Sequence, residues 1–173
     1  MVLAIHYDAS YLSENNARSR AGGQHFLSHD EENHPNNGAV FNLSTIIRNV
    51  ISSASEAELG ALFLNSKTEV PMCKTLEDLG HPQPRTPIQT DNKTADGLTN
   101  NKIILKATKS IGMKFHWLQC RDNLDQFRFF WRPGHTILRD YLTKHHTGAH
   151  YKSFRQAIIT SRKFLDTMHA YIK

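Results

Sequence analysis

Long apolar runs, cysteines and a leader-like N-terminus are all scarce in this chain of 173 residues. No run approaches the roughly 20 apolar residues of a membrane-spanning helix, and the mean hydropathy is −0.52. The start, "MVLAIHYD", has too short an apolar stretch for a signal peptide and no basic leader. Cys73 and Cys120 stand far apart, without the spacing of a disulfide or metal motif. These absences exclude a helical membrane protein and predict free thiols in a reducing, intracellular compartment, cytoplasmic or nuclear.

The chain also has no excess of acidic residues over basic ones. The chain has 21 Lys and Arg against 16 Asp and Glu, a net charge of +5 with its histidines neutral, and a pI near 9.3. This charge favours a polyanionic partner such as nucleic acid. A basic protein without such a partner is equally compatible with the charge alone.

The hydrophobic pattern predicts the element order β-β-β-α-β-α-β-α. Strands are expected at 2–7, through "QHFLS", through "AVFNLS", at 87–90 and through the aromatic "QFRFFW". Helices are expected at 53–66, 67–80, near 92–100, near 109–122 and in "ILRDYLTKHH", with Pro71 separating the first two. This order predicts a mixed sheet flanked by helices, with parallel strands after the crossover, over residues 1–147. Residues 148–173 are expected to form a basic, helical C-terminal tail.

The first predicted helix places a glutamate among apolar side chains. In "SSASEAELGALFL", residues 52–64, a projection at about 100° per residue sets Glu56 and Glu58 in nearly opposite directions. Glu56 falls in the polar gap, whereas Glu58 falls between Ala54 and Leu62 in the apolar arc. A carboxylate there costs several kcal/mol unless a partner balances its charge. Glu58 is therefore a candidate functional residue.

Three further acids occupy comparable places. Asp8 ends the first strand, Asp91 ends the fourth, and Asp140 lies in the last short helix. If the first and fourth strands are neighbours, Asp8 and Asp91 come together at the carboxyl edge of the sheet, with Glu58 above them. Clustered carboxylates need a cation to remain ionised, and hard oxygen ligands favour Mg²⁺ or Mn²⁺. Two such ions can promote phosphodiester cleavage, although each acid taken alone is also compatible with a helix cap or a solvated surface charge.

Six stretches now fit a known pattern. In order they are "YDASYLSE…RSRAGG", "SSASEAELGAL", "PIQTDNKTADGLTNNK", "KFHWL", "FRFFWRPGHT" and "LRDYLTKHH". Together, over roughly residues 2–150, they resemble the ribonuclease H domain of copia-type retrotransposon polyproteins. The resemblance implies an α/β fold with a five-stranded mixed sheet, three antiparallel strands followed by parallel ones, flanked by helices. It also implies an endonuclease that cuts the RNA strand of RNA–DNA hybrids, and a reverse transcriptase as partner in the parent polyprotein.

The resemblance also assigns residues. The family's metal-binding and catalytic acids fall on Asp8, Glu58, Asp91 and Asp140, which would hold two Mg²⁺ or Mn²⁺ ions. His135, in the turn before the last acid, is a candidate for assisting proton or product release, although a solvated turn histidine fits the same position. Phosphate and sugar contacts are expected from Arg18, Arg20 and Asn92, which are otherwise ordinary polar surface residues.

Two alternatives remain open beside a ribonuclease H. Arg139 replaces the small residue that usually precedes the last acid in this family, which fits a non-catalytic, retroelement-derived binding domain. A nuclease or integrase of the same broad fold that acts on DNA is the other alternative. His146 and His150 have helical metal-ligand spacing, but Gly148 is expected to break the helix and no third ligand is evident, so a zinc site is not predicted. Phe127, Phe129 and Trp131 alternate along a strand and are expected in the core.

Overall fold

The structure, a computed structural model, describes residues 1–29, 38–91, 109–132 and 140–159. Five strands form one sheet in the order β3-β2-β1-β4-β5. Their bounds are β1 Val2–Glu14, β2 Arg18–Ser28, β3 Ala39–Ile46, β4 Thr86–Thr90 and β5 Phe127–Trp131. The first three strands pair antiparallel, whereas β4 is parallel to both β1 and β5. The predicted five-stranded mixed sheet is confirmed.

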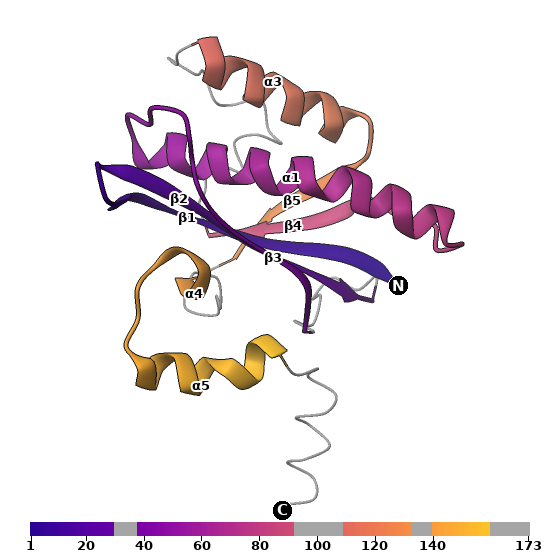
Figure 1. The fold of residues 1–173 in the computed structure, drawn as a ribbon. Coiled ribbons are helices and arrows are strands. Elements are labelled where there is room, and N and C mark those ends of the chain that lie inside the picture. The colour runs from indigo at the N-terminus through magenta and orange to yellow at the C-terminus, as the bar shows by residue number, and fades with distance from the viewer. Residues whose placement is uncertain (30–37, 92–108, 133–139, 160–173) are drawn as a thin grey trace, which may run out of the picture.

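The helices lie on both faces of this sheet. Their bounds are α1 Ala54–Asp78, α3 Lys109–Asn123, α4 Asp140–Thr143 and α5 Gly148–Ile159. Figure 1 shows α1 and α3 on one face, α4 on the opposite face, and α5 beyond α4. In the described part of the chain, no helix combines the length and apolar character that a membrane span requires.

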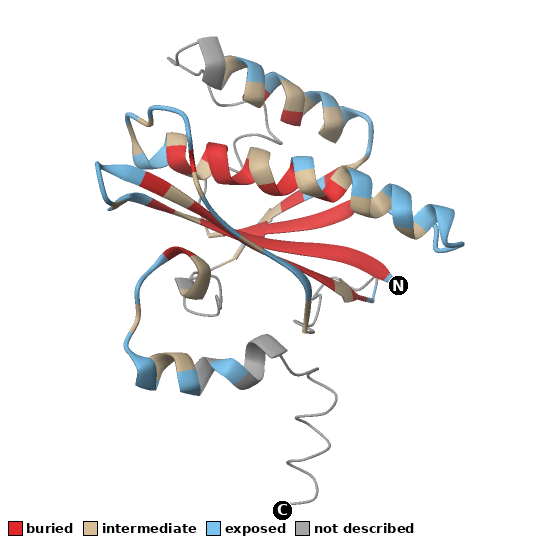
Figure 2. Ribbon diagram, viewed as in Figure 1, coloured by how far each residue is buried: buried red, intermediate tan, exposed pale blue. Residues whose placement is uncertain are grey.

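The hydrophobic core lies between the sheet and α1 with α3. Figure 2 shows burial concentrated in the central strands and on the sheet-facing side of α1. Among its largest fully buried side chains are Ile5, Tyr7, Leu62, Ile88, Leu118 and Phe127. Burying each aliphatic or aromatic side chain of this size contributes about 1.5–3 kcal/mol. The central strands therefore form a rigid base for the side chains at the ends of these strands.

The first hairpin is longer than predicted. The expected end of the first strand at Asp8 is wrong, because β1 continues to Glu14 and β2 begins at Arg18. Asp8 pairs with Gly22 and Ser10 with Arg20. Backbone pairing continues past Asp8 to Glu14, with one irregularity between Ser10 and Glu14, whatever the polarity of the side chains, so a polar stretch does not end the strand. The tight turn uses left-handed conformations at Asn16 and Ala17, with φ of 61° and 51°.

Pro71 does not divide the first helix, so that prediction is wrong. Residues 54–78 form one continuous α-helix with Pro71 inside it. Proline removes the hydrogen bond to the carbonyl four residues earlier, that of Lys67. Both residues are exposed, so water can hydrate this carbonyl. On the solvent-exposed side of a helix that packs against a sheet, a proline therefore costs less stability than on the buried side.

Two smaller expectations are corrected. Phe127 and Phe129 are buried, but Trp131 is 40% exposed and is not a core residue. Gly148 does not interrupt a helix, because α5 begins there. The predicted free thiols are confirmed for Cys73 and Cys120. The helix expected near 92–100 lies outside the described residues.

Candidate metal centre

Asp8 and Asp91 are brought together by the parallel pairing of β1 with β4. His6 is in register with Gln89, so the two aspartates each lie two residues further along neighbouring chains. Side chains two residues apart in a strand point to the same face. The register therefore directs both carboxylates to one side of the sheet, at the carboxyl end of β4.

The third acid, Glu58, is contributed to this edge of the sheet by α1. The helix begins at the N-cap Ser53, whose side chain accepts a hydrogen bond from the Glu56 N–H at 3.2 Å. The Glu56 carboxylate accepts the N–H of Ser52 at 2.6 Å. Glu56 is thus occupied in capping the helix. This geometry is consistent with the place of Glu56 in the polar gap of the helical projection, away from Glu58.

Three acids converge at this edge. Asp8, Glu58 and Asp91 each offer a carboxylate oxygen, and these oxygens all lie within 4.8 Å of one another. Asp8 is buried and the other two are half-buried, and the Oε2 atom of Glu58 is itself fully buried. Among the described residues, this is the one group of three or more possible ligands.

The electrostatics of this group favour a cation. Two carboxylates at this separation repel each other by roughly 3–4 kcal/mol at an effective dielectric of about 20. Three hard oxygen donors without sulfur or imidazole match the preferences of Mg²⁺ and Mn²⁺. The donor set therefore fits the divalent ion that the sequence predicts.

The remaining predicted site residues are placed differently. Asp140 begins α4, the helix that lies against β1, β2 and β3, but its side chain is outside the described part. His135 and Asn92 lie outside the described residues. Arg18 is exposed at the start of β2. Arg20 pairs with Glu14, with 2.7 Å between Nε and Oε1, and its hydrogen bond lowers the pKa of the Glu14 carboxyl.

Two residues at this site were not predicted. Thr143 is buried in α4, and its hydroxyl donates a hydrogen bond to Oδ2 of Asp8. Trp131 donates its Nε1–H to the Asp91 carbonyl at 2.7 Å, which fixes the backbone where β4 ends. Thr143 follows Asp140 by three residues, and this helical spacing is the signal that could have identified it.

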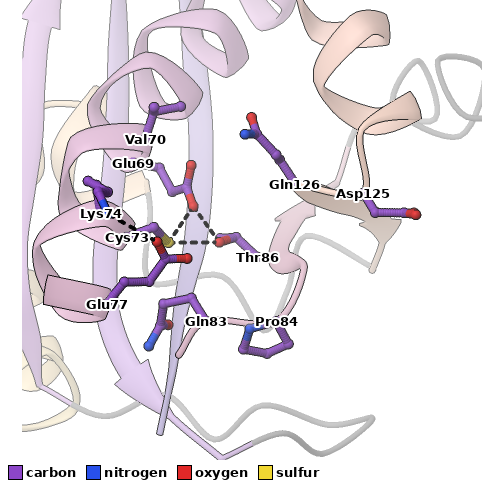
Figure 3. A pocket seen from close by; sticks show the side chains of 10 residues that line it. All are labelled: Glu69, Val70, Cys73, Lys74, Glu77, Gln83, Pro84, Thr86, Asp125 and Gln126. Carbon is purple, nitrogen blue, oxygen red and sulfur yellow. Dashed lines mark hydrogen bonds and ion pairs between the residues drawn. The ribbon is translucent and has the colours of Figure 1, made fainter. Parts of the chain in front are cut away.

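The site is separate from a pocket at the other end of α1. That pocket, of about 290 Å³, is lined by the later turns of α1, by Gln83, Pro84 and Thr86, and by Asp125 and Gln126. Figure 3 shows the Glu69, Cys73 and Thr86 side chains directed toward one another there. Glu69 is buried, and burial raises the pKa of its carboxyl, opposed by hydrogen bonds from Cys73 and Thr86. This arrangement is a buried polar contact between α1 and β4, remote from the three acids.

Comparisons with known proteins identify the fold. No family model and no curated protein matches the chain. Among solved structures, LC11-RNase H1, isolated from compost by a metagenomic approach, matches with a TM-score of 0.58 and 14% identity, covering 82% of this chain and 92% of that one. The same protein in complex with an RNA/DNA hybrid matches at 0.52, with 15% identity over 82% and 93% of the two chains.

A viral structure gives a third match. The protease–reverse transcriptase of prototype foamy virus has a TM-score of 0.50 and 18% identity, covering 91% of this chain and 20% of that one. At such identities the likeness concerns the fold. The chain therefore has a ribonuclease H-like fold, as predicted, while the copia-type kinship stays a prediction.

Proposed function

We propose that this chain is a divalent-metal-dependent endonuclease that hydrolyses the RNA strand of RNA–DNA hybrids. The observation that supports it most is the convergence of Asp8, Glu58 and Asp91 within 4.8 Å at the carboxyl edge of parallel strands. The ribonuclease H-like fold adds support, because LC11-RNase H1 has been seen with a hybrid bound. We further propose that the chain derives from a copia-type polyprotein, in which a reverse transcriptase would be its partner.

Each part of the chain has a role in this proposal. Asp8, Glu58, Asp91 and Asp140 would hold two Mg²⁺ or Mn²⁺ ions, which when bound activate water and stabilise the leaving oxygen. The pairing of β1 with β4 sets the separation of Asp8 and Asp91, and α1 contributes Glu58. Buried surroundings strengthen their attraction for a cation.

The substrate would be held by other residues. Arg18, Arg20 and Asn92 would contact backbone phosphates and the 2′-hydroxyl that distinguishes RNA from DNA. His135 would assist release of the proton or product. The net charge of +5 favours approach of the polyanion.

A pair of glutamates tests the proposal within a single helix. The full chain is incubated with a labelled hybrid and Mg²⁺ or Mn²⁺, beside Glu58→Gln, Asp91→Asn and Glu56→Gln. We expect the first two variants to lose at least about 100-fold in cleavage rate, since each removes a charged ligand. Glu56→Gln serves as matched control and should cleave within about threefold of wild type, because Glu56 caps the helix instead of facing the acids.

Either of two results would reject the proposal. One is the absence of cleavage by the wild-type chain, and the other is full activity in Asp91→Asn. Arg139 beside Asp140 supports a second candidate, a non-catalytic binding domain. That candidate predicts salt-sensitive hybrid binding with no turnover. Faster cleavage of a DNA duplex than of the hybrid would instead indicate a DNA nuclease.

A further inference from the structure

Thr143 makes a buried contact with the candidate metal centre that no role assigned above requires. Its side chain is 2% exposed, and its hydroxyl donates to Oδ2 of Asp8. Asp8 is itself 4% exposed. Because both groups are removed from water, this hydrogen bond restricts the orientation of the Asp8 carboxylate.

The absence of a side chain at Gly22 of β2 leaves space for Thr143. Asp8 pairs with Gly22 of β2, and a Cβ atom at Gly22 would lie 2.5 Å from Cγ2 of Thr143. The same atom would lie 3.0 Å from Cβ of Leu142. Any side chain at position 22 would therefore displace α4. The missing side chain lets this helix approach close enough for the hydrogen bond to Asp8 to form.

A second contact holds α4 from the neighbouring strand β3. Ser44 of β3 donates its hydroxyl to the Leu142 carbonyl at 2.8 Å. Arg20 of β2 donates to the same Ser44 hydroxyl at 3.1 Å. The backbone next to Thr143 is thus held by Ser44, whose hydroxyl is in turn bound by Arg20, so the surrounding structure directs the threonine hydroxyl at Asp8.

We propose that Thr143 is a positioning residue that orients Asp8 for binding of a divalent cation, and that couples Asp8 to the helix of the fourth acid. The inference rests on the proposed function. A hydrogen bond to one oxygen of a ligating carboxylate limits the directions in which its oxygens face the metal. Because Asp140 and Thr143 share α4, the same hydrogen bond also fixes the distance between that helix and β1.

The far end of the sheet offers a matched control. Thr86 of β4 is 1% exposed, and its hydroxyl donates to Oε1 of the buried Glu69, as Figure 3 shows. Replacing either threonine with valine keeps the shape and removes a buried hydroxyl–carboxylate hydrogen bond. Thr86→Val should therefore reproduce the effect of Thr143→Val on stability, without the effect on the metal centre.

The experiment compares Thr143→Val, Thr143→Ser, Thr86→Val and wild type. Binding of Mn²⁺ alone is measured from the free-ion signal in electron paramagnetic resonance, and hybrid cleavage is measured against Mg²⁺ concentration. We expect Thr143→Val to weaken Mn²⁺ binding by about 10–100-fold and to raise the Mg²⁺ concentration for half-maximal cleavage by a similar factor. Thr143→Ser retains the hydroxyl and should stay within about threefold of wild type, with the KM for hybrid unchanged in both variants.

Thermal unfolding separates positioning from a structural role. Both valine variants should lower the Tm by roughly 2–8 °C, but only Thr143→Val should change Mn²⁺ affinity. If wild type binds Mn²⁺ without cutting the hybrid, the proposed function fails while the Mn²⁺ titration still decides the role of Thr143. Equal Mn²⁺ affinity in Thr143→Val and wild type, equal loss in Thr86→Val, or no Mn²⁺ binding by wild type would each overturn the inference.

Discussion

His25 is a buried imidazole that joins β2 to α1. Its Nε2 lies 3.1 Å from Oδ1 of Asn65, whose Nδ2 donates to the carbonyls of Gly22 and Ala61. Because the amide nitrogen is used in those two bonds, the amide oxygen faces His25, and the imidazole donates from Nε2. Its Nδ1 is buried with no hydrogen-bond partner, so a second proton there would have no acceptor.

Burial lowers the pKa of His25 to about 4, and the hydrogen bond that its imidazole donates to Asn65 partly opposes this shift. The native state therefore binds fewer protons than the unfolded state between about pH 6.5 and pH 4. Stability should be fully present above this window and fall by about 3 kcal/mol as the pH drops through it. Urea unfolding of wild type and His25→Gln from pH 7 to pH 4 measures this loss, which the variant should lack.

An exposed histidine provides the comparison for that experiment. His116 lies on the exposed side of α3, and His116→Gln should keep the wild-type pH dependence. Glu69 acts in the opposite direction, because its raised pKa makes the native state bind more protons as the pH falls toward 4.5. Since Glu69 is present in every variant, its contribution cancels in the difference. A wild-type slope in His25→Gln would contradict the role given to this residue.

Two adjacent glycines on β2 set the distances between the layers of elements. Gly22 faces α4, whereas a Cβ atom at Gly23 would lie 1.6 Å from Oδ1 of Asn65 on α1. We expect Gly23→Ala to push α1 from the sheet and cost about 2–3 kcal/mol in the free energy of unfolding. Gly112 in α3 has no atom within 4 Å of an added Cβ, so Gly112→Ala should instead stabilise the protein by about 0.5–1 kcal/mol. Chemical denaturation measures both, and a neutral Gly23→Ala would show that α1 can shift without cost.

At the level of elements, sequence periodicity predicted type and order better than length. The sheet, α1 and α3 follow from apolar patterns that bury one face, and the helical projection separated Glu58 from Glu56. The extension of β1 past Asp8 was missed because hairpin pairing, a long-range property, satisfies the backbone of polar residues. The same limit applies to Thr143 and Trp131, whose contacts with Asp8 and Asp91 depend on how distant segments pack.

Across the whole molecule, the strands and α1 combine stability in the core with a cluster of like charges at one edge. The buried residues of β1, β4 and α1 fix the backbone, and that rigidity holds three carboxylates within 4.8 Å of one another. Without a cation their repulsion opposes folding, so the candidate site is a local cost to stability that a bound ion would offset. Under the proposed function, stability and activity would thus be coupled through the bound ion.

This coupling predicts that one substitution changes the sign of its effect with metal. In EDTA, Asp91→Asn should raise the Tm above that of wild type by about 3–6 °C, because it removes one charge from the cluster. With Mn²⁺ at about 100 times its dissociation constant, wild type should gain about 2.7 kcal/mol and become the more stable of the two. Asp78→Asn, an exposed acid that pairs with Lys74 at 2.9 Å, should respond to Mn²⁺ as wild type does. Calorimetric melting with and without Mn²⁺ checks the crossing, and an Asp91→Asn variant that gains as much from Mn²⁺ as wild type would exclude a metal site at these three acids.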